Sequence, residues 1–290
     1  MMSDEIPETE LCRLEVDGPV AKITLDRTEA HNALNVQLIT ELIELLKWTS
    51  KRSVGRTGEL RDRQGNQFLR VLLMVSEGKH FCAGADINMM KEGGGKSPKE
   101  NREDAERLDG LFHGLWSHPC FTIACVQGAA LGGGAGMVAC VDHSIGGPRT
   151  QIALSEAKLG ISAAVIGPYV YRRLGSAHFR RLAMRASRVE SDEALRIGFI
   201  DELVDSQESM STSAKSVISD VLTSGPMAVT SAKKMVADLD EWDGTKESLR
   251  LWTLDLTSEM RGSPEGQEGL SAFIEGRKPA WFPEDRDGKL

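Results

Sequence analysis

Long apolar runs are missing from this chain. No stretch reaches the roughly 18 residues that a membrane-spanning helix needs. A basic leader is missing as well, because the first ten residues, MMSDEIPETE, are acidic where secretory and mitochondrial presequences are basic. We therefore expect no membrane partner and a cytoplasmic location, with the mitochondrial matrix as the alternative if a presequence has been removed.

The chain also lacks paired metal or disulfide ligands and an excess of positive charge. Its five cysteines form an odd set without a CxxC pair, and its six histidines form neither HxH nor HxxxH. We expect reduced, buried thiols and no metal. The 43 acidic and 35 basic side chains give a net charge of −8, which argues against nucleic acid or anionic lipid as a partner. A small-molecule ligand is favoured.

The apolar pattern predicts two regions in the 290 residues. Strands alternate with helices until about residue 204, which is typical of an α/β fold. Beyond that point the chain predicts only four amphipathic helices. We therefore expect an α/β domain over residues 1–205 and a helical domain over residues 206–290.

Within the first region, residues 11–25 predict a hairpin and residues 71–76 a buried strand. The segment between them predicts an amphipathic helix, with Asn32 or Asn35 as its N-cap. Residues 91–100, KEGGGKSPKE, contain so many glycines and charges that we expect a mobile loop without regular structure.

Several segments carry a family resemblance through their order and spacing. They are DRTEAHNALN (26–35), HFCAGADI (80–87), QGAALGGGAGMVACVD (127–142) and ALSEAKLG (153–160). Together they resemble the crotonase superfamily of enoyl-CoA hydratases and isomerases, and the similarity continues to EGLSAFIEGRKPAW near the end of the chain. The resemblance implies a spiral of repeated ββα units followed by a helical oligomerisation domain.

The resemblance also implies how the site binds a CoA thioester. The oxyanion hole would be the backbone N–H groups of Ala83 and Gly133, which stabilise charge on the thioester oxygen. The backbone around Ala30, Ala85, Asp86 and Ile87 would accept the adenine and pantetheine parts of CoA. CoA then enters with the substrate, and no separate cofactor is expected. Asp86 has an alternative as a helix cap.

The glutamates decide the predicted chemistry. Hydratases of the family typically use two, and this chain has only the second, Glu156, because Gly136 stands at the position of the first. A single carboxylate suits a Δ3,Δ2-enoyl-CoA isomerase. The glycine and its flanking residues nevertheless look most like the bacterial-type methylglutaconyl-CoA hydratase branch. In that case, a water held by main chain or by the substrate's own carboxylate would replace the missing group.

These considerations favour an enoyl-CoA hydratase for a branched or carboxylated acyl group, as in leucine breakdown. The alternatives are the isomerase and a non-catalytic CoA-binding subunit. By resemblance, the C-terminal helices would assemble a homotrimer or a dimer of trimers. Phe273 and Lys278 could then reach a neighbour's CoA.

Overall fold

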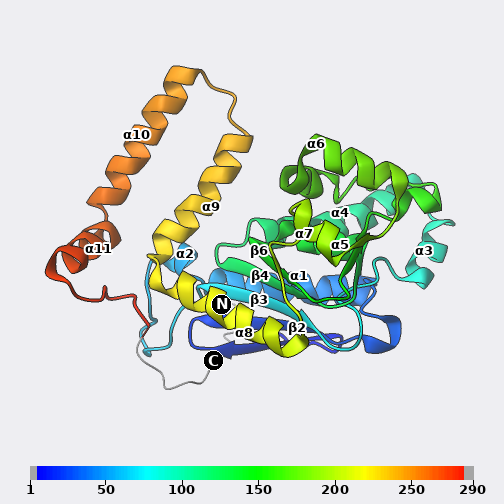
Figure 1. Cartoon of the computed structure of the whole chain (residues 1–290), viewed down its shortest axis with the longest axis horizontal. Coiled ribbons are helices and arrows are strands. Elements are labelled where there is room, and N and C mark those ends of the chain that lie inside the picture. The colour runs from blue at the N-terminus through cyan, green and yellow to red at the C-terminus, as the bar shows by residue number, and fades with distance from the viewer. Residues whose placement is uncertain (1–4, 284–290) are drawn as a thin grey trace.

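The computed structural model describes residues 5–283 and is built on a six-stranded sheet (Figure 1). The strand order is β1-β2-β3-β4-β6-β9, in which only the β1–β2 hairpin is antiparallel. This confirms the predicted hairpin and the parallel α/β arrangement. The strands are β1 (Cys12–Asp17), β2 (Val20–Leu25), β3 (Val71–Ser76), β4 (Phe121–Val126), β6 (His143–Gly146) and β9 (Glu202–Leu203).

A smaller sheet has the order β5-β7-β8 and lies beside the first. Its strands are β5 (Ala129–Leu131), β7 (Gln151–Ala153) and β8 (Val189–Glu190). Short 3-10 turns η1 (Thr28–Ala30) and η2 (Glu156–Leu159) follow β2 and β7. One strand of each sheet is therefore followed by a tight turn, and both turns contain residues that the sequence analysis singled out.

Two helices join β2 to β3, and the predicted N-cap is confirmed at Asn35. They are α1 (Val36–Lys51) and α2 (Val54–Thr57), and the Asn35 side chain accepts the Leu38 N–H at 2.8 Å. Asn32 has a different role, because its side chain binds the backbone of Arg27, Glu77 and His80. It thereby holds the turn after β2 against the loop after β3.

Residues 91–100 are more regular than the sequence predicts. Helix α3 (Ile87–Gly93) extends into them, and α4 (Pro98–Trp116) begins inside them. Ser97 and Glu100 form a reciprocal capping box at the start of α4, so polar residues that suggested a loop instead stabilise a helix N-terminus. Only residues 94–97 lie between the two helices.

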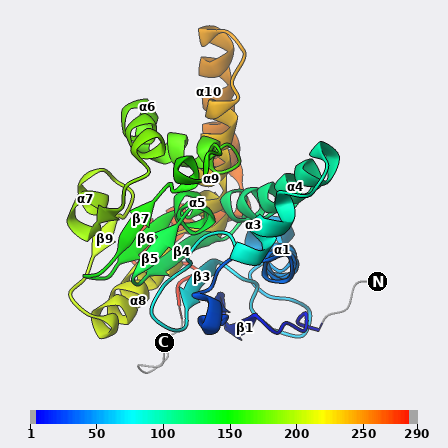
Figure 2. The same ribbon diagram turned by 90° about the vertical axis from the view of Figure 1, so that its right-hand side faces the viewer.

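Successive side chains along a strand point to opposite faces of the main sheet, and each face carries its own apolar cluster. Leu72 and Ala124 belong to the larger cluster, with α1, α4 and α5 (Gly133–Cys140). Val71 and Ile123 belong to the smaller one, which α8 (Gln207–Thr223) covers. Figure 2 shows α8 on one side of the strands and α4 and α5 on the other. Helices α6 (Gly167–Arg185) and α7 (Ser191–Arg196) complete the larger layer.

The remaining helices form an arm that stands away from the sheets (Figures 1 and 2). The arm consists of α9 (Pro226–Asp240), α10 (Lys246–Gly262) and α11 (Pro264–Glu275). The four predicted C-terminal helices are thus present. A division after residue 205 would place α8 with the arm, whereas its apolar side packs on the sheet.

None of the helices between residues 5 and 283 has the length and apolar character to cross a bilayer. In the same residues, His, Cys, Asp and Glu side chains form no cluster that could hold a metal ion. All five cysteines are buried and unbonded to one another.

Candidate active site

Two chain segments lie side by side where the large and small sheets meet. Cys82 forms a parallel bridge with Ala130, and its carbonyl accepts the Leu131 N–H at 3.0 Å. Gly84 follows with φ +96°, and a Cβ there would lie 2.8 Å from the Leu131 carbonyl oxygen. Only glycine suits this close approach, because both the backbone angle and the space exclude a side chain.

Helix α5 begins directly after this contact. Its N-cap, Gly132, has φ +48° and donates its N–H to the Ala153 carbonyl at 2.8 Å. A Cβ on Gly134 would lie 2.5 Å from the Cys82 carbonyl oxygen, so the first turn packs against the Cys82 backbone. The N–H groups of a first helical turn have no partner within the helix. The glycine run therefore presents unpaired amides beside residues 82–85.

Glu156 lies on the other side of this helix start. It opens η2 just after β7, and a Cβ on Gly132 would lie 3.3 Å from its Oε1. Its Oε2 is buried without a hydrogen-bond partner in the described residues. Burial raises the pKa of Glu156, because removal from water disfavours the charged carboxylate, and its own backbone N–H opposes this only weakly. The Glu156 carboxyl therefore exchanges its proton closer to neutral pH than an ordinary glutamate does.

The structure contradicts one predicted oxyanion donor and leaves the other available. The Ala83 N–H already donates to the His31 carbonyl at 3.0 Å. The half-buried Gly133 forms no such bond within residues 5–283. Sequence reasoning could not separate Ala83 from its neighbours, because the direction of a backbone N–H depends on which strand it pairs with.

The Ala85 N–H, unlike that of Ala83, is free in the part of the chain that the structure describes. It forms an isolated parallel bridge with Leu34, in which Leu34 donates to the Gly84 carbonyl at 2.7 Å and accepts from the Asp86 N–H at 2.9 Å. The central residue of such a bridge points its own N–H away from its partner. The Ala85 N–H therefore faces away from Leu34, and it forms no hydrogen bond within the described residues.

The predicted CoA-binding residues belong to two turns, η1 and the turn that precedes α3. Ala85 and Ile87 are exposed and Ala30 is half-buried in η1. Asp86 acts as the helix cap of α3, because it accepts the N–H groups of Asn88 at 2.8 Å and Met89 at 3.3 Å. It also pairs with Arg27 at 2.7 Å. Arg27, which the sequence analysis did not single out, thus joins the Ala30 turn to the Asp86 turn.

The space beside Gly136 is filled with carbon. A Cβ on this residue would lie 2.5 Å from Ile166 Cγ2 and 2.9 Å from Phe112 Cε1. A side chain at this position would therefore require Ile166 or Phe112 to move. Phe112 was missed from the sequence, because it belongs to α4, an element distant from the glycine run.

Cys82 has no reactive thiol. Burial raises its pKa to about 12, so at neutral pH it stays a neutral, packed side chain.

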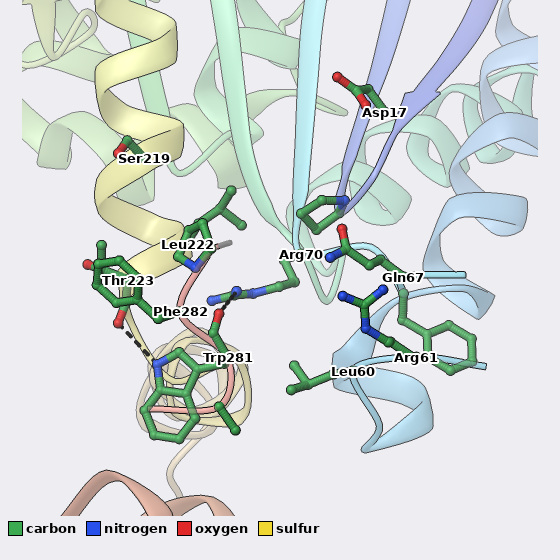
Figure 3. A pocket seen from close by; sticks show the side chains of 14 residues that line it. Asp17, Leu60, Arg61, Gln67, Arg70, Ser219, Leu222, Thr223, Trp281 and Phe282 are labelled. Atoms are coloured by element: carbon green, nitrogen blue, oxygen red, sulfur yellow. Dashed lines mark hydrogen bonds between the residues drawn. The ribbon is translucent and has the colours of Figure 1, made fainter. Parts of the chain in front are cut away.

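A separate cavity of about 320 Å3 lies far from this chemistry, beside Arg70 (Figure 3). The Arg70 guanidinium points to the Trp281 carbonyl and donates to it at 2.9 Å, and the Trp281 Nε1–H donates to the Thr223 carbonyl at 3.0 Å. The cavity forms where the C-terminal segment returns to α8. It contains none of the predicted site residues.

Comparison with known proteins agrees with this geometry. The family model for enoyl-CoA hydratase/isomerase matches residues 15–284. A short-chain-enoyl-CoA hydratase of Clostridium acetobutylicum is 30% identical, over 93% of this chain and 96% of its own length. A carnitinyl-CoA dehydratase of Citrobacter koseri is also 30% identical, over 91% and 95%.

Solved structures give the same result for the fold. The crystal structure of an enoyl-CoA hydratase from Shewanella pealeana has a TM-score of 0.85 and 33% identity, and the match covers 94% of this chain and 97% of that one. The similarity extends over nearly all of the fold that holds Glu156 beside the start of α5. The chain therefore belongs to the enoyl-CoA hydratase/isomerase family, within the crotonase superfamily.

Proposed function

We propose that the protein adds water across the 2,3 double bond of an enoyl-CoA thioester, with Glu156 as its proton carrier. The observation that carries this proposal is the buried, unpaired Oε2 of Glu156 beside the free amides at the start of α5. A carboxylate without a donor is ready to accept a proton, and its raised pKa favours returning that proton later.

The amides of Gly133 and Ala85 would stabilise the thioester oxygen. As the oxygen of a water molecule bonds to C3, its proton passes to Glu156 and the electrons of the double bond move onto the thioester oxygen. The enolate then takes the proton from Glu156 at C2, so that one water is added. Unpaired N–H groups at a helix start favour the negative intermediate, because they are fixed donors beside the positive end of the helix.

A branched or carboxylated acyl group, such as that of 3-methylglutaconyl-CoA, is our choice of substrate. Its support is the sequence resemblance around Gly136, together with the similarity to a short-chain-enoyl-CoA hydratase and a carnitinyl-CoA dehydratase. The carbon-filled space beside Gly136 also favours a second candidate, the Δ3,Δ2-enoyl-CoA isomerase, because moving a proton from C2 to C4 needs only one carboxylate.

Incubation with three thioesters tests these functions. The purified protein is mixed separately with 3-methylglutaconyl-CoA, crotonyl-CoA and a 3-enoyl-CoA, while enoyl absorbance is followed and products are weighed by mass spectrometry. Loss of conjugation with a gain of one water, fastest for the glutaconyl substrate, supports the proposal. Gain of conjugation at constant mass from the 3-enoyl substrate alone supports the isomerase. CoA binding without turnover would make the chain a binding subunit.

We also propose that the arm assembles copies of this chain into a trimer or a dimer of trimers. Helix α10 buries none of its residues in the single chain. Phe273 on α11 is 86% exposed and Ile274 is 82% exposed, an arrangement that is unfavourable in water. A neighbouring copy would cover these side chains and bring the exposed Phe273 towards its CoA site.

A further inference from the structure

The side of α5 at Gly136 is closed by two buried side chains from different elements. Phe112 comes from α4 and has no exposed surface, and Ile166 precedes α6 and is 3% exposed. The three atoms nearest to a Cβ on Gly136 are Ile166 Cγ2 at 2.5 Å and Phe112 Cε1 and Cζ at 2.9 and 3.0 Å. A Cβ contact below 3.0 Å requires something to move, and neither neighbour is the free end of a flexible chain.

The Phe112 ring packs against Tyr169 and lies beside the start of α5. Its centroid lies 6.1 Å from that of Tyr169, whose hydroxyl donates to Asp109 at 3.3 Å. Its Cζ would also lie 3.7 Å from a Cβ on Gly133. Phe112 Cζ therefore lies beside both Gly133 and Gly136.

We propose that Phe112 and Ile166 are positioning residues that make this a one-carboxylate site. They fill the volume into which an acid at residue 136 would project, so that Glu156 alone takes up and returns the proton. This inference rests on the proposed function, because it assumes that Glu156 exchanges a proton with an acyl-CoA substrate. It adds the physical reason why no second acid can stand beside it on α5.

A one-carboxylate site has a recognisable kinetic consequence. In hydration, Glu156 accepts a proton from water and then delivers it to C2; in isomerisation, it removes a proton from C2 and delivers it to C4. Both reactions begin with ionised Glu156 and need no group that is protonated at the start. The rate should therefore follow a single ionisation, whereas an acid and a base on separate residues give a bell-shaped profile.

The groups around Glu156 do not add a second ionisation of their own. The pKa of Glu156 is raised by burial and lowered by its own backbone N–H, without a contribution from any charged neighbour. Besides Glu156, η2 carries Lys158 and α5 carries Cys140. The two helices that pack on α5 add Tyr169, Tyr171, Arg172, Arg173, His178, Arg180, Arg181 and Arg185 of α6, and Lys99, Glu100, Arg102, Glu103, Asp104, Glu106, Arg107, Asp109 and His113 of α4. Burial raises the pKa of both Cys140 and Tyr169, so neither ionises near neutrality.

The first experiment is the pH dependence of kcat/KM for whichever reaction the full-length protein catalyses. We expect one acidic limb of slope one, with its midpoint above the ordinary glutamate value of about 4.3, and a plateau up to pH 9. Circular dichroism at each pH confirms that the protein stays folded. A bell-shaped profile from folded protein would overturn the inference, because a second group would then take part.

The second experiment removes the side chains that fill the space beside Gly136. Gly136→Glu alone should lower the melting temperature by many degrees and abolish turnover. In the Phe112→Ala/Ile166→Ala background, Gly136→Glu should fold as well as that background and acquire an alkaline limb. Gly136→Gln in the same background is the matched control, with equal volume and no charge, and should keep the single limb. A stable and fully active Gly136→Glu single variant would contradict the inference.

A smaller substitution keeps the inference testable if the opened background does not fold. Gly136→Ala should lower the melting temperature markedly in the natural chain and much less in an Ile166→Ala variant, since Ile166 supplies the closest atom. Equal effects in both would show that Ile166 does not close this side. These measurements need no turnover, so an absence of both reactions would overturn the proposed function and leave the packing result standing.

Discussion

At Glu156, burial and the lack of a partner act together. A half-buried glutamate normally pairs with a base or accepts backbone donors, and either would lower its pKa. Here the Oε2 atom has no such partner in the described residues, and burial raises the pKa. The protein thus keeps an arrangement that disfavours the charged carboxylate, which is typical of sites where a proton must be exchanged.

Replacing this carboxylate should separate activity from stability. Glu156→Gln should lower kcat by about 10²- to 10⁴-fold, because the proton carrier is lost. The raised pKa means that ionising natural Glu156 destabilises the fold as pH rises through the ordinary and then the raised value. The Gln variant should therefore melt higher than the natural protein at pH 7, and this advantage should vanish near pH 4.

Thermal unfolding at both pH values and initial rates at pH 7 check this prediction. The exposed Glu59→Gln serves as a control and should change neither quantity. A Gln variant that melts lower at pH 7 than the natural protein would show that the carboxylate is stabilising, contrary to its burial.

The element that decides the site is α5, whose small residues allow three segments to meet. Gly132 faces Glu156, Gly134 faces the Cys82 carbonyl and Gly136 faces Phe112 and Ile166. Each of these three positions is thus close to a different neighbour. A methyl group on any of them would displace a different neighbour.

Gly134→Ala should destabilise the protein by about 1–3 kcal/mol, because its Cβ would lie 2.5 Å from a backbone oxygen that cannot rotate away. Turnover should also fall, since moving α5 displaces the Gly133 amide. Gly262→Ala is the matched control: it lies at the end of α10 with open space around it and should be neutral or slightly stabilising. Urea unfolding of the two variants gives the comparison, and equal stabilities would contradict the packing argument.

A buried arginine, Arg70, helps to hold the C-terminal segment after α11 to the end of α8, beside the Trp281–Thr223 hydrogen bond. Arg70 donates to the carbonyls of Ser224 at 2.6 Å, Val221 at 3.3 Å and Trp281 at 2.9 Å. Burial lowers its pKa to about 10, which leaves it charged at neutral pH. The positive guanidinium near the C-terminal end of α8 also interacts favourably with the negative end of the helix dipole.

Arg70→Met should destabilise the protein by about 1–3 kcal/mol, because three carbonyls lose a charged donor. Limited proteolysis should then cleave between α8 and α9 sooner than in the natural protein. The exposed Arg63→Met provides the control and should leave both the melting temperature and the cleavage pattern unchanged. Unaltered proteolysis of the Arg70 variant would show that the segment is held by other contacts.

At the scale of the whole molecule, the arm has more apolar surface than a single chain can bury. Leu251 and Leu254 on α10 are 48% and 53% exposed, and they lie one turn apart on the helix. The sheets are covered on both faces without help from the arm. Assembly therefore explains the arm better than folding of the single chain does.

Leu251→Asp/Leu254→Asp should shift the sedimenting species from the assembled mass towards that of one chain, 31.6 kDa. The charges would have to be buried against the neighbouring copy, which is unfavourable. Ser258→Asp adds the same charge at an exposed polar position of α10 and should leave the mass unchanged. A natural protein that already sediments as one chain would contradict the proposed assembly.

The sequence by itself determined the elements and the family. Period-two and helical apolar patterns predicted the hairpin, the buried strands and the four C-terminal helices, because those patterns record which face of each element is buried. The motifs around Gly133 and Glu156 predicted a candidate site, since glycine runs and a lone acid stand at fixed positions along the chain.

Only the tertiary structure decided which groups of the site are free to act. Ala83 and Ala85 look alike in the sequence, but bonding to His31 occupies one amide and bridging to Leu34 turns the other away from its partner. Gly136 likewise looks like an empty position until Phe112 and Ile166 are brought against it. Hydrogen-bond direction and close packing both depend on residues far apart along the chain, so local patterns cannot specify them.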